Sequence, residues 1–240
     1  LSTFPEKANL LEAQGIDHLV KIPFTRDFAS MSPEEYIKVV LDERINTRKM
    51  IIGYDHRFGK DRSGGLDELK AFAPKYNFDV EEISRQDIDE IGISSTKIRT
   101  ALQSGDITTA NTYLGRNYCV SGRVIHGNQL GRSIGYPTAN IEVKENYKLI
   151  PADGAYAVKV CNKYTKFDGM LNIGQKPTIG GENKTIEVNI FDFNQDIYNT
   201  EITIEFVDHV RNEIKFDSLD SLKLQLAEDE KAVRNRLSKL

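Results

Sequence analysis

The hydrophobic and polar positions follow two different periods along the chain. Up to about residue 115, segments with apolar residues at helical spacing alternate with short apolar runs that are typical of strands. The elements predicted in this half are, in chain order, a helix over 5–14, a strand over 16–22, a helix from residue 32, a strand over 49–53, a helix over 66–76, a strand over 78–83, and helices over 95–103 and 106–114. Strands that alternate with helices predict a parallel sheet.

Two segments of this half carry clear local signals. Ser32 can cap a helix whose first turn holds Pro33, and Glu35 completes a capping box. The run over 49–53 is apolar without alternation, which is typical of a strand covered on both faces.

After Gly115, apolar residues alternate with polar ones. This period of two predicts strands over 118–125, 156–161, 185–191 and 201–207. Asn162-Lys163 lies between two alternating runs and can form a hairpin turn. Short strands at such close spacing predict a small closed barrel. From Asp217 onward the helical period returns, so we expect a C-terminal amphipathic helix that packs on the barrel. The change of period predicts two domains, residues 1–115 and 116–240.

Composition narrows the classes of partner. The 240 residues include 32 Lys and Arg against 36 Asp and Glu, a net charge of -4, which argues against a nucleic-acid-binding protein. The apolar runs are far shorter than the roughly 20 residues that span a bilayer, so no membrane segment is expected. Two cysteines cannot form a disulfide scaffold. The sequence therefore predicts a soluble cytoplasmic protein, and it leaves the oligomeric state open.

A glycine-rich segment follows the first predicted strand of the barrel. Gly127, Gly131 and Gly135 would let backbone N–H groups approach an anion closely, although for the glycines alone flexible hairpin turns are the favoured interpretation. Thr138 and Asn140 follow, two residues apart at a strand start, so their side chains project to the same side. A hydroxyl and an amide oxygen are suitable ligands for Mg²⁺ that is also held by nucleotide phosphates.

A carboxylate on the strand over 185–191 is the candidate general base. Ile186, Val188 and Ile190 share one face of this strand, whereas Glu187 and Asn189 share the other. Glu187 therefore points away from the apolar face and can accept a proton from a hydroxyl nucleophile. Taken alone, a glutamate at such a position is more often an ordinary solvated residue.

These motifs together resemble a known family. The riboflavin kinase barrel is similar to several parts of this chain: the segment over 127–140, Asn172 with the two residues after it, Glu187, Phe193, and the segment from Arg211. The segments over 53–59 and 93–99 resemble the adenylyltransferase half of the bacterial bifunctional riboflavin kinase/FAD synthetases, and all of these motifs occur in the order of that family. The resemblance implies an α/β, Rossmann-like nucleotidyltransferase domain with an incomplete parallel sheet, followed by an all-β closed barrel with a C-terminal helix.

The resemblance also implies a reaction and its residues. Riboflavin would be phosphorylated to FMN by ATP with Mg²⁺, and Glu187 would take the proton from the terminal ribityl hydroxyl. Asn172 and Arg211 would lie on the flavin side. The residues implied for ATP are Gly127, Gly131, Arg132, Gly135, Thr138 and Asn140, of which Thr138 and Asn140 would also hold Mg²⁺. The alternative is a flavin- or nucleotide-binding module without catalysis.

In the first half, Ser94, Ser95 and Thr96 stand at a helix start with Arg99 close behind. An ordinary serine cap is the simpler interpretation of these residues, but the resemblance favours ATP binding. Members of the family bind phosphate for adenylyl transfer from ATP to FMN with a His-x-Gly-His motif, and no two of the four histidines here lie within four residues of each other. We therefore expect weak or absent FAD synthesis, and we expect the chain to be a fragment of a longer protein.

Overall fold

The chain forms two compact units in a computed structural model that describes residues 1–53, 55–83, 87–88, 91–127, 129–162, 165–178 and 181–239. The barrel unit comprises Leu1–Leu10 with Ile93–Leu240, and the small unit comprises Leu11–Gly92. Tyr54 of the motif over 53–59 and Lys163 of the predicted hairpin turn lie outside the described residues.

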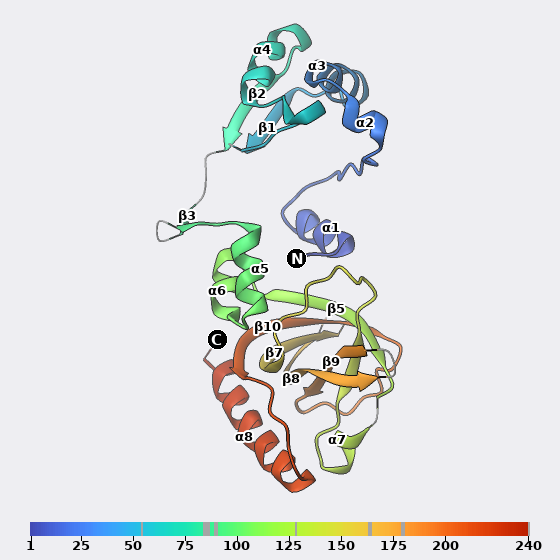
Figure 1. Ribbon diagram of the computed structural model, residues 1–240, viewed down its shortest axis with the longest axis vertical. Helices are drawn as coiled ribbons and strands as arrows, with labels where there is room; N and C mark the ends of the chain where they lie inside the picture. The colour runs from blue at the N-terminus through green and yellow to red at the C-terminus, as the bar shows by residue number, and fades with distance from the viewer. Residues whose placement is uncertain are drawn as a thin grey trace. The chain divides into compact units, whose positions relative to one another are not determined.

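The small unit contains the predicted parallel sheet. Strands β1 (Lys49–Gly53) and β2 (Asp79–Ile83) pair in parallel, and helix α4 (Leu66–Tyr76) connects them (Figure 1). The remaining elements are α2 (Arg26–Ser30), α3 (Pro33–Tyr36), the π-helix η1 (Ile37–Arg44), the 3₁₀-helix η2 (Lys60–Arg62), and the short antiparallel pair β3 (Asp87–Ile88) and β4 (Ile91–Gly92). The capping box at the start of α3 is confirmed, because Ser32 and Glu35 each accept the other's backbone N–H.

Two predictions for this unit are wrong. Residues 16–22 form no strand, and the chain there is an exposed coil, because an apolar pattern alone cannot supply the partner strand whose backbone a strand must pair with. Strand β1 is covered on one face only. Ile52 packs against residues of η1 and α4, whereas Ile51, on the opposite face, is 57% exposed.

The barrel unit contains the predicted closed antiparallel barrel. Its strands follow one another around the barrel in the order β10-β5-β6-β9-β8-β7. They are β5 (Tyr118–Ile125), β6 (Ala139–Glu142), β7 (Gly154–Asn162), β8 (Thr165–Thr178), β9 (Gly181–Ile190) and β10 (Glu201–Arg211). Alternate residues such as Val158, Leu171 and Val188 are buried in the interior and pack in one cluster. The barrel therefore has a packed core rather than a channel, and ligands must bind at its end or outside it.

Helices on both the N-terminal and the C-terminal side of the barrel strands accompany the barrel. Helices α5 (Ser95–Gln103) and α6 (Ile107–Leu114) contribute side chains to the same core as the strands. The compact unit thus begins before residue 115, where the hydrophobic period changes, and a domain boundary at 115 stays a prediction. The short α7 (Leu130–Ser133) lies in the glycine-rich segment, and α8 (Leu219–Leu237) is the expected C-terminal helix. Val233 and Leu237 of α8 pack against Ala157 and Met170 on the outside of the barrel (Figure 1).

The first turn of helix α1 (Phe4–Ala13) docks on the barrel through a buried ion pair. Lys148 Nζ lies 2.6 Å from Glu6 Oε2, with side chains only 1% and 9% exposed. Lys148 also donates to the Leu1 carbonyl, at 2.9 Å. Nowhere in the described part of the chain is a helix both long and apolar enough to cross a bilayer.

Candidate functional site

The strand register brings candidate residues from distant parts of the sequence into one row. Asn140 is opposite Glu187 on β6 and β9, and Glu187 is opposite Asn172 on β8. The row continues across β7 to β10, where Ala155 pairs with Asn172 on one side and Arg211 on the other. Directly opposed residues on neighbouring strands share a face of the sheet. We call this set the outer row: Asn140, Glu187, Asn172, Ala155 and Arg211.

The outer row faces away from the barrel core. Leu171 and Ile173 flank Asn172 and are buried inside the barrel, and Ile186 and Val188 do the same for Glu187. Because successive side chains of a strand point to opposite faces, the polar residues between them must point outward. The sequence-based prediction of the two faces of this strand therefore agrees with the burial pattern.

Thr138 joins the outer row to the chain before β6. Its Oγ1 donates a hydrogen bond of 3.3 Å to Glu187 Oε2. The loop after β5 passes directly against Asn140, so closely that a Cβ atom at Gly127 would overlap the Asn140 amide group. A hydroxyl, an amide and a carboxylate thus come together on adjacent strands, and Gly127 is the residue that leaves them room.

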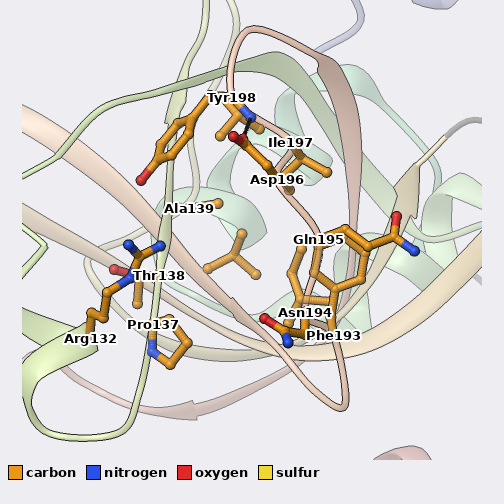
Figure 2. A pocket seen from close by; sticks show the side chains of 13 residues that line it. Arg132, Pro137, Thr138, Ala139, Phe193, Asn194, Gln195, Asp196, Ile197 and Tyr198 are labelled. Atoms are coloured by element: carbon orange, nitrogen blue, oxygen red, sulfur yellow. Dashed lines mark hydrogen bonds between the residues drawn. The ribbon is translucent and has the colours of Figure 1, made fainter.

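A cavity of about 610 Å³ lies beside Thr138 (Figure 2). Arg132, Pro137 and Thr138 form one side, which we call the loop wall. The segment 193–198, between β9 and β10, curves around the other side and is called the 193–198 wall. Val124 and Val188, from the barrel interior, line the cavity between the walls. The cavity therefore combines apolar barrel residues with polar groups at its rim, and Thr138 connects it to Glu187.

The loop wall is held in place by its own turn and by β9. Tyr136 N donates to Gly131 O at 2.8 Å, and a Cβ atom at Gly131 would collide with the Tyr136 carbonyl. Gly135 has a φ of +91°, which favours glycine. Asn189, on the same face of β9 as Glu187, donates its Nδ2 to the Pro137 carbonyl at 2.7 Å. The position of Thr138 is thus fixed from both sides.

The 193–198 wall is held at its far end by β5. Asn199 N donates to Val124 O at 2.8 Å, and Val124 N donates to Thr200 O at 2.9 Å. The Tyr198 ring stacks on His126, with ring centroids 3.8 Å apart. Sequence reasoning missed this wall, since its polar run between two strands has the appearance of an ordinary turn. Only Phe193 was noted, as part of the family resemblance.

Helix α8 holds Arg211 at the far end of the outer row. Asp229 accepts from Arg211 Nε at 3.0 Å and from Nη2 at 2.7 Å, and is itself only 4% exposed. Gln225 Nε2 donates to the same carboxylate at 2.9 Å, and Arg211 Nη1 donates to the Asn212 carbonyl. A Cβ atom at Gly174 would collide with Glu213, so the segment after β10 lies directly against β8. Arg211 is therefore a fixed residue at the edge of the row.

The other predicted ATP residues lie on a different element. Ser94 caps α5 and accepts a hydrogen bond from Lys97 N at 3.3 Å. Ser95, Thr96 and Arg99 are exposed on the first turns of this helix. None of these four residues lines the cavity beside Thr138.

A metal ion at this site would depend on a bound ligand. Within the described ranges, no group of three or more His, Cys, Asp and Glu side chains could hold a metal ion. Thr138 and Asn140 offer neutral oxygen atoms instead. Because Thr138 donates its hydroxyl proton to Glu187, the lone pairs of its oxygen remain available to a cation.

Comparison with known proteins identifies similar chains. Residues 114–237 match the family model described as riboflavin kinase, and residues 1–97 match the one described as FAD synthetase. A bifunctional riboflavin kinase/FMN adenylyltransferase from Haemophilus influenzae is 40% identical over 225 residues, which cover 93% of this chain and 72% of that protein.

Another protein of the same name, from Buchnera aphidicola subsp. Schizaphis graminum, is 41% identical over 98% of this chain and 76% of its own. A solved structure from Streptococcus pneumoniae, named a macrolide-efflux protein, superposes with a TM-score of 0.89 at 35% identity, covering 97% of this chain and 75% of that one.

Proposed function

Because this chain belongs to the family of bifunctional riboflavin kinase/FMN adenylyltransferases, enzymes of flavin cofactor biosynthesis, we propose that its barrel transfers a phosphoryl group from ATP to riboflavin at the outer row. One observation supports this placement most directly. Thr138 lines the cavity and also donates a hydrogen bond to Glu187. A nucleotide in the cavity and a hydroxyl on the outer row would therefore meet at one place.

The cavity beside Thr138 is proposed to bind ATP. Its volume of about 610 Å³ lies within the usual range of small-molecule sites. Apolar barrel residues suit a nucleobase, whereas the Arg132 guanidinium suits phosphates. We place the terminal phosphate toward Thr138 and Asn140, where the loop meets the outer row.

Thr138 and Asn140 would hold Mg²⁺ together with the phosphates of ATP. Their neutral oxygens fit a hard cation that has its negative ligands on the nucleotide. When bound, Mg²⁺ neutralises charge on the phosphate oxygens. Gly127 keeps Asn140 in place by leaving room for its amide.

Glu187 is proposed to act as the general base. Its carboxylate points outward and receives a hydrogen bond from Thr138, which limits its orientation. It would take the proton of the terminal ribityl hydroxyl while that oxygen bonds to the γ-phosphorus. The bond from the γ-phosphorus to the β,γ-bridging oxygen breaks, and ADP leaves with that oxygen. The products are FMN and ADP.

Riboflavin would then lie along the outer row, from Glu187 past Asn172 toward the segment after β10. Asn172 is adjacent to Glu187 and supplies an amide that can donate or accept. Each nitrogen of the Arg211 guanidinium donates to either Asp229 or the Asn212 carbonyl, which fixes the side chain in place. We therefore assign Arg211 the role of fixing the segment that borders the flavin.

For adenylyl transfer, the start of α5 is proposed to bind ATP through Ser94, Ser95, Thr96 and Arg99. Exposed N–H groups and hydroxyls at a helix start favour phosphate. We expect this polypeptide to make little FAD, because its sequence contains no His-x-Gly-His motif.

Incubation of the protein with riboflavin and Mg-ATP tests the proposal. Chromatography should detect FMN and an equal amount of ADP, with no FMN when EDTA replaces the magnesium salt. The same chromatogram measures FAD. Flavin fluorescence quenching without any FMN would refute the kinase proposal and support a binding module.

A further inference from the structure

We propose that helix α8 ties the two walls of the cavity together through Glu230 and Arg234, and that Arg234 is a positioning residue for ATP. The inference rests on the proposed binding of ATP in that cavity. Neither residue lines the cavity itself. Both would act through residues that immediately precede its walls.

Arg234 holds the start of the 193–198 wall. Its Nη1 lies 2.9 Å from Asp192 Oδ2, and its Nη2 lies 3.3 Å from Asp192 Oδ1. The guanidinium also sits 4.3 Å from the centroid of the Phe191 ring. Asp192 has a φ of +56°, a left-handed conformation that aspartate adopts more readily than most residues. Arg234 therefore binds the turn at which the 193–198 wall begins.

Phe191 packs the same turn against α8. Its side chain is 5% exposed and packs in one cluster with Val233 and Leu237 of the helix. The arginine thus lies over a ring that the helix already buries. The start of the 193–198 wall is held by both an apolar contact and an ion pair.

Glu230, one turn earlier on α8, connects Arg234 to the loop wall. Arg234 Nε donates to Glu230 Oε1 at 2.9 Å. Burial, the negative charge of Glu230 and a hydrogen bond with Glu230 together raise the pKa of the Tyr136 phenol. Tyr136 packs against the α8 cluster and directly precedes Pro137 and Thr138. Helix α8 therefore contacts the residues that precede both walls: Tyr136 packs against its apolar cluster, and Asp192 pairs with its Arg234.

The ion pair is too exposed to matter much for folding. The side chain of Asp192 is 80% exposed and that of Arg234 is 43% exposed, and such pairs contribute little to stability. A loop that already has its bound conformation, however, loses less entropy when a ligand orders it. Loss of Arg234 should therefore weaken ATP binding while the fold persists.

Arg234→Gln should raise the KM for ATP by about three- to tenfold, the range expected from the loss of an exposed ion pair together with a cation–π contact. The KM for riboflavin and kcat should stay within about twofold of wild type. Asp192→Asn should act similarly, because asparagine tolerates the same backbone conformation but lacks the charge. Arg234→Lys should restore part of the affinity, since it keeps the charge and loses the two-pronged geometry.

Arg236→Gln is the matched control. Arg236 lies two residues further along α8 with 36% of its side chain exposed, and it pairs with Asp208 at 3.0 Å. It also donates to the His209 carbonyl at 2.6 Å, so its contacts are with β10 and not with either wall. Its loss should leave the KM for ATP unchanged. Thermal melting should confirm that Arg234→Gln and Arg236→Gln are folded.

The outcomes separate the inference from the proposal on which it rests. A wild-type KM for ATP in Arg234→Gln, in a preparation whose wild type makes FMN, would overturn the inference alone. An equal rise in Arg236→Gln would also overturn it, because the effect would then reflect the docking of α8 in general. A wild-type protein that makes no FMN would overturn the proposed function and the inference with it.

Discussion

Substitution of Gly127 by alanine should move a single functional side chain. The three atoms nearest to the added Cβ would all belong to the Asn140 amide group, with Cγ at 2.5 Å and Oδ1 at 2.8 Å. The φ of Gly127 lies outside the left-handed region, so alanine is compatible with the backbone there. The substitution therefore creates a steric conflict with Asn140 and no backbone strain.

The magnitude follows from the contact that Asn140 would lose. If its amide oxygen serves a charged Mg-phosphate group, the interaction is worth about 1.5–3 kcal/mol. At about 1.4 kcal/mol per factor of ten, Gly127→Ala should lower kcat/KM for Mg-ATP by roughly 10- to 150-fold. The riboflavin affinity should change little, because Asn140 is on the nucleotide side of Glu187.

The assay is steady-state FMN formation with varied Mg-ATP at saturating riboflavin. Gly115→Ala is the control, because Gly115 has a φ of +65° and nothing within 4 Å of its added Cβ. That variant should lose stability, by about 1–2 kcal/mol, and keep its activity. A Gly127→Ala variant with wild-type kcat/KM, or one no worse than Gly115→Ala, would refute the role assigned to Asn140.

Three further predictions concern the barrel unit. Lys148→Met leaves Glu6 as a buried carboxylate without its ion-pair partner and should lower the free energy of unfolding, measured by urea titration, by about 3–5 kcal/mol. Lys159→Met breaks a more exposed pair and should cost under about 1 kcal/mol, so similar losses in the two variants would contradict this prediction. Burial lowers the pKa of His209, so below about pH 6.5 the unfolded chain binds more protons than the folded one. The free energy of unfolding should therefore fall from pH 7 to pH 5, and less steeply in His209→Gln. Parallel profiles of stability against pH in wild type and variant would show the reasoning to be wrong. Burial, and to a smaller extent the negative charge of Glu205, raises the pKa of Cys161 to about 11. Alkylation of this thiol should therefore become about tenfold faster per pH unit between pH 8 and pH 10. Rapid labelling of the folded protein at pH 8 would contradict this.

The period of the sequence predicted which way side chains point, but not which of them meet. Alternation alone placed Glu187 opposite to Ile186 and Val188, and the burial of these two residues bears this out. The pairing of Glu187 with Asn140 and Asn172 depends on the register of three strands that are far apart in sequence. Register is set by turns and by the packed core, so no local pattern could have supplied the outer row.

The elements that prediction missed are those whose order comes from tertiary contacts. Segment 193–198 forms a cavity wall because Arg234 and Val124 hold its two ends, and both contacts are non-local. The predicted strand over 16–22 has suitable residues but forms a coil in the described structure. In both segments the conformation depends on the neighbours that the folded chain supplies, and local propensity does not determine it.

Replacement of Glu187 by glutamine tests the central claim most directly. Glutamine keeps the shape and can still accept from Thr138, but it cannot take a proton. Single-turnover FMN formation should fall by roughly 10²–10⁴-fold, while the riboflavin dissociation constant from fluorescence quenching stays within about twofold. Glu201→Gln, at an exposed position at the start of β10, should retain wild-type turnover. Wild-type turnover in Glu187→Gln would contradict the account, since Glu187 would then not be the base.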